Sequence, residues 1–193
     1  MAPHRVVEVA RAVFPRDALA TADSGAHALA VTAFWDSYDP KGFLISTEGG
    51  TGTALPAAIA AKLAFPDRPV VAFMGEGGFF ASLAEIGTAS ELAAPVVAVV
   101  FLDESFSLVR VLQERRHYAP VGVTAGPTRI ENLAEDLGAC GILVETEDDL
   151  RLALHDALSA PKPAIIGVRV NPHGYRKMLD VLSGTISSSK PRS

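Results

Sequence analysis

Three continuously apolar runs constrain the fold of this chain more than any other feature of its sequence. They are VVAFM (70–74), VVAVVFL (96–102) and AIIGVRV (164–170). A strand with one solvent-exposed face alternates apolar and polar residues, whereas a strand covered by helices on both faces is apolar throughout. Helix-period segments separate the strand-like ones along the chain. The sequence therefore predicts an α/β fold, a doubly wound parallel sheet flanked by helices.

The expected helices and strands fill most of the chain. We expect helices over 6–14, 55–65, 83–92, 129–137 and 147–158, and strands over 17–22, 42–46, 69–74, 95–102, 141–145 and 163–170. Capping boxes, in which Thr128 pairs with Glu131 and Thr146 with Asp149, are predicted to open the last two helices. No internal linker divides the chain, so residues 1–182 are predicted to form one domain and residues 183–193 a flexible tail.

Composition and charge exclude several classes of function. A formal net charge of −5 without a basic patch argues against a nucleic-acid partner. Charged residues interrupt the apolar pattern of the first 14 residues, which predicts neither a signal peptide nor a membrane span. The single cysteine, Cys140, rules out a disulfide within the chain and is expected to be a buried thiol. A cytoplasmic protein is the resulting expectation.

Two acidic residues follow two of the apolar runs directly. Glu76 comes after VVAFMG and Asp103 after VVAVVFL, with 26 residues (77–102) between them. If the two strands are neighbours, both carboxylates converge beyond the carboxyl edge of the sheet, where ligands bind in such folds. A hard cation such as Mg²⁺ would relieve their repulsion, and Gly75, Gly77 and Gly78 would let backbone N–H groups approach an anion. The alternative is a strand-end turn, where glycine and acidic residues are common without any ligand.

The segment GEGGF…LAEIGTASELAAPVVAVVFLDES (75–105) resembles the thiamine-diphosphate motif. In most of that family the motif reads Gly-Asp-Gly, then some 26 residues, then Asn-Asn. The segment LPAAIAAKLAFPDRPVVAFMGEGGF, which leads into it, is similar to acetolactate synthase-like enzymes, and so are SLVRVLQE and NLAEDLGACGILVETEDDLRLALHDAL further along. Residues 5–175 thus resemble the diphosphate-binding domain of thiamine-diphosphate-dependent enzymes.

The resemblance implies a thiamine diphosphate and Mg²⁺ site. Glu76 and Asp103 stand at the two positions of side-chain metal ligands, and Ser105 stands where a backbone carbonyl is the third. Gly77 and Gly78 would donate N–H groups to the diphosphate, while Gly49 and Thr51 stand where the family's backbone meets the aminopyrimidine ring. The cofactor-binding residues implied by the resemblance are Gly49, Thr51, Gly75, Glu76, Gly77, Gly78, Asp103 and Ser105.

Three of these positions depart from the family pattern. Glu76 replaces an aspartate and is longer by one methylene, and Asp103 replaces an asparagine and adds a negative charge next to an anionic cofactor. Two unit charges about 4 Å apart repel by several kcal/mol at an intermediate effective dielectric constant. Thr51 replaces a bulky apolar residue that wedges the cofactor into its bent shape. A non-catalytic or regulatory binding protein with an eroded cofactor site is therefore the alternative function.

The resemblance also implies a partner. In this family a glutamate from a separate pyrimidine-binding domain activates the cofactor, and no segment of this chain resembles that domain. Because the methionine at position 1 directly precedes the diphosphate-domain pattern, we expect a stand-alone subunit in an α2β2-type hetero-oligomer. Relatives such as sulfopyruvate decarboxylase divide the two domains in this way. Glu48, in the pyrimidine-facing loop, is the only local candidate for the activating acid, and a solvated loop carboxylate is its plainer interpretation.

The expected function is therefore that of the diphosphate-binding subunit of an enzyme acting on a 2-oxo acid. The acetolactate synthase-like pattern favours carboligation (a transferase), whereas the divided layout favours simple decarboxylation (a lyase). The loop GGTGTA (49–54) hints at a dinucleotide-binding fingerprint, but it lacks the third glycine and a ribose-binding acid. A nicotinamide-dependent enzyme is therefore not supported.

Overall fold

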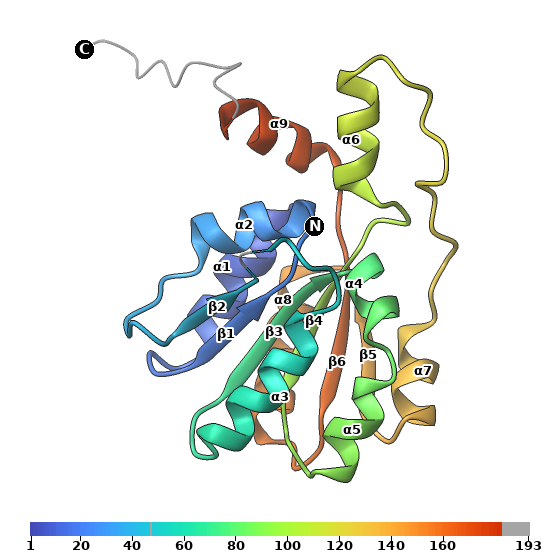
Figure 1. Cartoon of the computed structure of the whole chain (residues 1–193). Helices are drawn as coiled ribbons and strands as arrows, with labels where there is room; N and C mark the ends of the chain where they lie inside the picture. The colour runs from blue at the N-terminus through green and yellow to red at the C-terminus, as the bar shows by residue number, and fades with distance from the viewer. Residues whose placement is uncertain (47, 183–193) are drawn as a thin grey trace, which may run out of the picture.

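In the part of the chain that the structure describes, six parallel strands form one sheet in the order β2-β1-β3-β4-β6-β5 (Figure 1). The computed structural model describes residues 1–46 and 48–182. The strands are β1 (Leu19–Ala22), β2 (Phe43–Ile45), β3 (Val70–Gly75), β4 (Val97–Leu102), β5 (Cys140–Val144) and β6 (Ala164–Arg169). The predicted α/β class and parallel sheet are confirmed, because the apolar runs 70–74, 96–102 and 164–170 supply the three central strands β3, β4 and β6.

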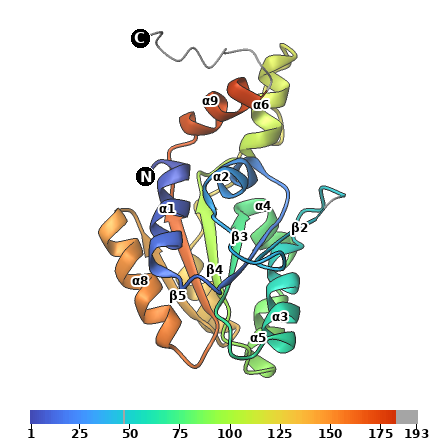
Figure 2. The ribbon, with the colours of Figure 1, turned by 90° about the vertical axis from the view of Figure 1, so that its left-hand side faces the viewer.

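Helices cover both faces of this sheet (Figures 1 and 2). They are α1 (Pro3–Val13), α2 (Ala26–Phe34), α3 (Ala54–Ala64), α4 (Glu76–Ala81), α5 (Glu85–Glu91), α6 (Ser107–Arg115), α7 (Ile130–Asp136), α8 (Glu147–Ser159) and α9 (His173–Leu182). Helices α1, α2 and α8 bury their apolar residues on one face, and α3, α5 and α7 bury theirs on the other. Since both faces are covered, the strands between them are apolar throughout.

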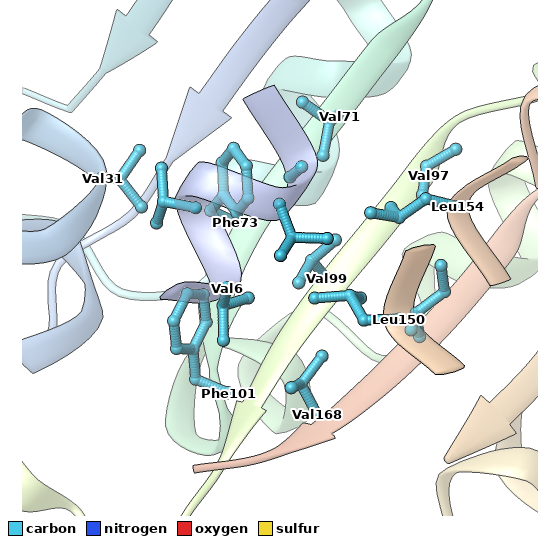
Figure 3. Close-up of a cluster of buried hydrophobic side chains, with 14 of the residues drawn as sticks. Val6, Val31, Val71, Phe73, Val97, Val99, Phe101, Leu150, Leu154 and Val168 are labelled. Atoms are coloured by element: carbon cyan, nitrogen blue, oxygen red, sulfur yellow. The ribbon is translucent and has the colours of Figure 1, made fainter. Parts of the chain in front are cut away.

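The first of these two cores shows how the layers hold together (Figure 3). Phe73 of β3 and Val99 of β4 point into it from the sheet, and Val6, Val31 and Leu154 meet them from α1, α2 and α8. All five side chains are fully buried. Burying one such side chain contributes roughly 1.5–3 kcal/mol, so this core fixes the sheet on which the loops at its carboxyl edge are mounted.

The order of the strands places several loops around one crevice. Strands β3 and β4 pair directly, with Gly75 opposite Phe101, so Glu76 and Asp103 follow neighbouring strand ends. From β1 the chain moves outward to β2, and from β3 it moves in the opposite direction to β4. The loops after β1 and β3 therefore diverge, and such a switch point forms a ligand crevice.

Several helices differ from their predicted positions. The helix expected over 83–92 is present as α5, but a further helix that was not predicted, α4, begins at Glu76 directly after β3. Helices α2, α6 and α9 were not predicted. In α2 the sequence AHALAVTAF is apolar on every side, so it has no helical periodicity to read.

One capping box is confirmed and the other is wrong. Thr146 accepts a hydrogen bond from the Asp149 N–H at 3.1 Å at the start of α8. Helix α7 instead has Arg129 at its N-cap without a side-chain cap, and the Thr128 hydroxyl donates to the Gly126 carbonyl at 3.5 Å. The sequence pattern there matched a capping box, but the chain enters the helix one residue later than the box requires.

The prediction of a buried Cys140 is also wrong, because this residue is exposed. It begins β5, which pairs only with β6 and forms one edge of the sheet. The first residues of an edge strand are covered less completely than those of a central strand. The predicted tail, residues 183–193, lies outside the described residues.

Candidate cofactor site

A cavity of about 380 Å³ opens at the carboxyl edge of β1, β3 and β4. This volume lies in the usual range of small-molecule sites. The cavity is lined by the segment 24–27 after β1, by Thr51, by the turn 75–78 with Phe80, by residues of the stretch 101–109, and by Tyr175. Five segments far apart in the sequence thus meet where the fold places a ligand.

Glu76 is the most buried carboxylate facing the cavity, with 3% of its surface exposed. It is the first residue of α4, and its Oε2 accepts a hydrogen bond from the Asp103 N–H at 3.2 Å. Its Oε1 is buried and has no hydrogen-bond partner among the described residues. Burial raises the pKa of the Glu76 carboxyl, and the charge of Asp103 raises it further.

Asp103 follows the neighbouring strand β4, and its hydrogen bonds order the segment that leads into α6. Its Oδ1 accepts from the Ser105 N–H at 3.1 Å, and its Oδ2 accepts from the Ser107 hydroxyl at 2.6 Å. Burial raises the pKa of the Asp103 carboxyl, and the hydrogen bonds from the Ser107 hydroxyl and the Ser105 N–H oppose that shift. Two carboxylates with raised pKa values, one buried and one half-buried, therefore line the same cavity, which is the situation that favours a cation or a shared proton.

The glycines around Glu76 are required by close packing. A Cβ at Gly77 would lie 3.1 Å from the Phe106 ring, and one at Gly75 would lie 3.1 Å from Nδ1 of His27. A Cβ at Gly78 would overlap the Asp23 carboxylate. The start of α4 therefore packs closely against three neighbouring segments, with no room for a side chain at Gly78, and its backbone forms the cavity wall.

The profile of the family described as "Thiamine pyrophosphate enzyme, C-terminal TPP binding domain" matches residues 23–168. The chain belongs to this family. The match covers most of the chain and all the cavity segments except Tyr175. The sequence-based assignment to the thiamine pyrophosphate (thiamine diphosphate) family is thereby confirmed.

Relatives and solved structures agree with this assignment. Acetolactate synthase of Bacillus subtilis (strain 168) is 35% identical over 170 residues, which are 88% of this chain and 30% of that protein. Benzoylformate decarboxylase of Pseudomonas aeruginosa is 30% identical over 173 residues, 86% of this chain and 32% of that protein. The thiamine diphosphate-dependent 4-hydroxybenzoylformate decarboxylase of Rhodococcus jostii RHA1 superposes with a TM-score of 0.84 at 28% identity, over 89% of this chain and 33% of that one.

The chain spans about a third of the length of the relatives that it matches. It corresponds to the C-terminal, thiamine pyrophosphate-binding domain of the family. Among the described residues, no helix is both long and apolar enough to cross a bilayer.

The predicted site residues of this thiamine pyrophosphate-binding domain fall into two groups. The cavity is lined by Thr51, Gly75, Glu76, Gly77, Gly78, Asp103 and Ser105. Gly49 and Glu48 are exposed and are not among the lining residues. The first group is brought together as the resemblance implied, whereas the loop that precedes Thr51 lies outside the cavity.

One structural observation is consistent with a divalent cation in the cavity: the Oε1 atom of buried Glu76 has no hydrogen-bond partner among the described residues. Ser105 lines the same cavity. The isolated β-bridge between Ser105 and Thr124 is formed by hydrogen bonds of the Phe106 N–H and the Glu104 carbonyl, and not by the Ser105 carbonyl. Within residues 1–46 and 48–182, no cluster of three or more histidine, cysteine or acidic side chains is poised for a metal. A cation here would thus rely on two carboxylates, a backbone carbonyl and oxygens from outside the chain.

Two elements of the site were missed in the sequence. Residues 24–27 line the cavity at the start of α2, and Tyr175 of α9 lines it although the phenol is only 1% exposed. The Ser24–Gly25 pair, one residue after the strand-like LATA (19–22), was the available signal for the first, because such pairs mark turns at strand ends. Burial, together with the charges of Asp103 and Glu76, raises the pKa of Tyr175 well above its ordinary value.

Helix α9 lies over this edge of the sheet, next to α6 (Figures 1 and 2). Two ion pairs hold them together, Arg115 with Asp180 at 2.5 Å and Arg176 with Glu114. Such exposed pairs contribute little individually. The buried Tyr175 is therefore the main anchor of α9 on the cavity.

Without divalent cations, stability should fall as the pH rises above about 4, because of Glu76 and Asp103. Both pKa values are raised by folding, so their contribution is fully present below the unfolded values near pH 4 and is lost as the pH rises through the folded values. Glu76→Gln, which keeps a neutral side chain, should therefore gain stability relative to wild type as the pH rises above about 4. We expect a relative gain of a few degrees in Tm, since about 1 kcal/mol corresponds to roughly 2–4 °C at this size.

Thermal melts in EDTA at several pH values measure this difference. Glu104→Gln is the matched control, because Glu104 is an exposed carboxylate next to Asp103 that pairs with Arg169. An offset between wild type and Glu76→Gln that stays constant with pH would contradict the prediction.

Proposed function

We propose that this chain is the diphosphate-binding part of a thiamine-diphosphate-dependent enzyme that acts on a 2-oxo acid. The observation that carries the proposal is the pair of carboxylates, buried Glu76 and half-buried Asp103, in a cavity at the strand switch point. The names of the relatives support the substrate class, because benzoylformate is a 2-oxo acid and acetolactate synthase belongs to the same family.

Magnesium would be held by Glu76, Asp103 and the Ser105 carbonyl, with the diphosphate and water completing its oxygen ligands. The free Oε1 of Glu76 supports this role, since its Oε2 is anchored by the Asp103 N–H. The hydrogen bonds from Ser105 N and the Ser107 hydroxyl fix the orientation of Asp103. The two carboxylates are thus held in place before a cation arrives.

The diphosphate would meet backbone N–H groups at two helix starts. Gly77 and Gly78 lie in the first turn of α4, and Gly25 and Ala26 lie at the start of α2, all four on the cavity wall. Unpaired N–H groups and the helix dipole favour an anion at such a position. Both helices begin at the same cavity, so the anion would be shared between them.

Bound thiamine diphosphate would act as the electron sink that makes loss of carbon dioxide from a 2-oxo acid feasible. This chain would bind the diphosphate end, while Phe80, Phe106 and Val109 form the rim of the cavity. These three apolar side chains line the cavity and are 46%, 38% and 49% exposed. Covered by a partner, they would exclude water from the reacting centre.

The partner in this proposal is a pyrimidine-binding domain on a second subunit, in an α2β2-type hetero-oligomer. Glu48 is exposed and does not line the cavity, so it is poorly placed to supply the activating acid. The exposed rim supports a docked partner, because apolar patches rimming a cavity mark interaction sites. The unpaired, exposed thiol of Cys140 suits a reducing compartment, and we therefore propose a cytoplasmic location.

Two fates of the substrate fit the same site. Simple decarboxylation would make the protein a lyase, and addition to a second carbonyl would make it a carboligase of the acetolactate synthase type. A non-catalytic binding protein with an eroded site is the second candidate function. Thr51, small and polar on the cavity wall, and the extra charge of Asp103 favour it.

Titration calorimetry with thiamine diphosphate and Mg²⁺ separates the enzyme from the eroded site. The proposed function predicts heat of binding that disappears when EDTA replaces Mg²⁺. The eroded site predicts no heat under either condition, and that result would overturn the cofactor-binding proposal.

Thr51 tests how the cofactor would be held. A branched or longer apolar side chain should support a bent cofactor more firmly than Thr51 does. The cofactor would then remain more often in the conformation that reacts. Thr51→Met and Thr51→Leu should therefore preserve or raise the activity of the enzyme reconstituted with its partner. Steady-state decarboxylation rates measure this. A drop of more than about tenfold, about 1.4 kcal/mol of barrier, would show that the site is adapted to Thr51.

A further inference from the structure

Asp23 is a buried carboxylate to which the proposed function gives no role. It follows β1 directly and is 0% exposed. Its Oδ2 accepts a hydrogen bond from the Gly52 N–H at 2.7 Å. Among the described residues its ion-pair partner is His27, whose Nε2 lies 3.0 Å from Oδ1. Burying a carboxylate costs free energy unless it is paired, and the contacts with Gly52 and His27 offset this cost.

His27 is held in a slot between backbone segments. The residue is 3% exposed and lines the cavity from the first turn of α2. A Cβ at Gly25 would lie 2.6 Å from its Nδ1, and one at Gly75 would lie 3.1 Å from the same atom. The ring also packs on Phe101, with centroids 5.6 Å apart. The imidazole therefore has little freedom to turn within its slot.

The Asp23 carboxylate also lies against Gly78. A Cβ at Gly78 would meet both carboxylate oxygens, so the glycine backbone packs directly on Asp23. Asp23 consequently touches the loop before α3 through Gly52, the start of α2 through His27, and the start of α4 through Gly78. These are three of the segments that line the cavity.

We propose that Asp23 is a positioning residue that sets the relative placement of these three segments and determines which nitrogen of His27 carries a proton. This inference rests on the proposed cofactor site for its functional consequence. Asp23 acts from beneath the cavity wall, because it is not among the residues that line the cavity. Its effect on a ligand is transmitted by Gly52, His27 and Gly78.

The placement of the proton follows from the contact itself. Nε2 and Oδ1 are 3.0 Å apart but do not align as a hydrogen bond, so the contact is electrostatic. A carboxylate charge 3.0 Å from Nε2 favours the tautomer that carries its proton on Nε2, because the positive end of the N–H dipole then lies near that charge. Nδ1 then lies toward Gly25 and Gly75, at the strand end of the cavity.

Asp23→Asn tests this with little change in shape. The new amide oxygen must still accept from Gly52 N–H, which turns its NH₂ group toward His27. Nε2 must then become an acceptor, and the proton moves to Nδ1. Nitrogen-15 shifts of the His27 ring, assigned by their absence in His27→Gln, should show a protonated Nε2 in wild type and an unprotonated Nε2 in Asp23→Asn. An unprotonated Nε2 in wild type would overturn the inference.

Cofactor affinity supplies the second measurement. Asp23→Asn should weaken binding of thiamine diphosphate with Mg²⁺ at least tenfold in titration calorimetry. Thr21→Val is the matched control, because Thr21 is also 0% exposed and its hydroxyl donates to Ala54 O at 2.7 Å, away from the cavity. It removes a buried bond between β1 and α3 and should change affinity less than threefold.

The outcomes of the two measurements are separable. Equal losses of affinity in Asp23→Asn and Thr21→Val, or no loss in either, would overturn the positioning role. If the wild-type chain binds no cofactor, the proposed function fails, and the nitrogen-15 shifts alone decide the inference about Asp23 and His27.

Discussion

The chain alone should turn over no 2-oxo acid, even when saturated with thiamine diphosphate and Mg²⁺. Activation of this cofactor in the family needs a carboxylate beside its aminopyrimidine ring. Glu48, the local candidate, is exposed and outside the cavity lining. The rim formed by Phe80, Phe106 and Val109 is also partly exposed, so water would reach the reacting centre and weaken its electrostatic contacts.

The assay compares the purified chain with the chain mixed with a pyrimidine-binding subunit. Each is supplied with benzoylformate or pyruvate, and carbon dioxide release is followed. We expect activity above background only in the mixture. Turnover by a verified homo-oligomer of this chain would contradict the prediction and would show that the acid comes from within the sequence. Glu48→Gln would then be the first variant to assay.

The central sheet was predictable because its signal is local. The runs 70–74 and 96–102 are apolar on both sides, and this alone requires helices on both faces. Parallel neighbours with carboxyl ends at one edge then bring Glu76 and Asp103 together, as observed. Both inferences need only the pattern of a strand and the residue that follows it.

Helix α4 was missed because its sequence argues against a helix. Gly77 and Gly78 disfavour a helix interior by about 1 kcal/mol each relative to alanine. They are tolerated because a Cβ at Gly78 would overlap the Asp23 carboxylate, and one at Gly77 would lie only 3.1 Å from the Phe106 ring. Tertiary packing therefore overrides local propensity at the very turn that forms the cavity wall.

The contacts of Asp23 could not be read from the sequence for a different reason. Gly52 lies 29 residues from Asp23, and Gly78 belongs to another loop again. Nothing in the spacing of these residues indicates that they meet. Their convergence follows from the strand order β1-β3-β4, which a single sequence does not determine.

Removing either carboxylate of the Glu76–Asp103 pair should abolish Mg²⁺-dependent cofactor binding. If two carboxylates and one backbone carbonyl hold a divalent cation, the loss of one carboxylate removes half of the negative charge that the protein supplies to it. We expect Glu76→Ala and Asp103→Ala each to weaken binding at least 100-fold in titration calorimetry, about 2.7 kcal/mol. The fold should survive in Glu76→Ala, because the carboxylate removed is buried, has a raised pKa and leaves one of its two oxygens without a hydrogen-bond partner. Glu104→Gln, beside the site, should bind as wild type does.

The double variant Glu76→Asp with Asp103→Asn separates charge from geometry. It restores the pair most common in the family and removes one negative charge next to an anionic cofactor, which should ease binding. It also shortens the side chain at position 76, so the anchoring bond from Asp103 N to the carboxylate, 3.2 Å in this structure, must re-form over a shorter reach. If the loop adjusts, affinity should stay within tenfold of wild type while both alanine variants fail. Wild-type affinity in both alanine variants would show that the two carboxylates hold no shared cation, and the assignment of this cavity as the magnesium site would be wrong.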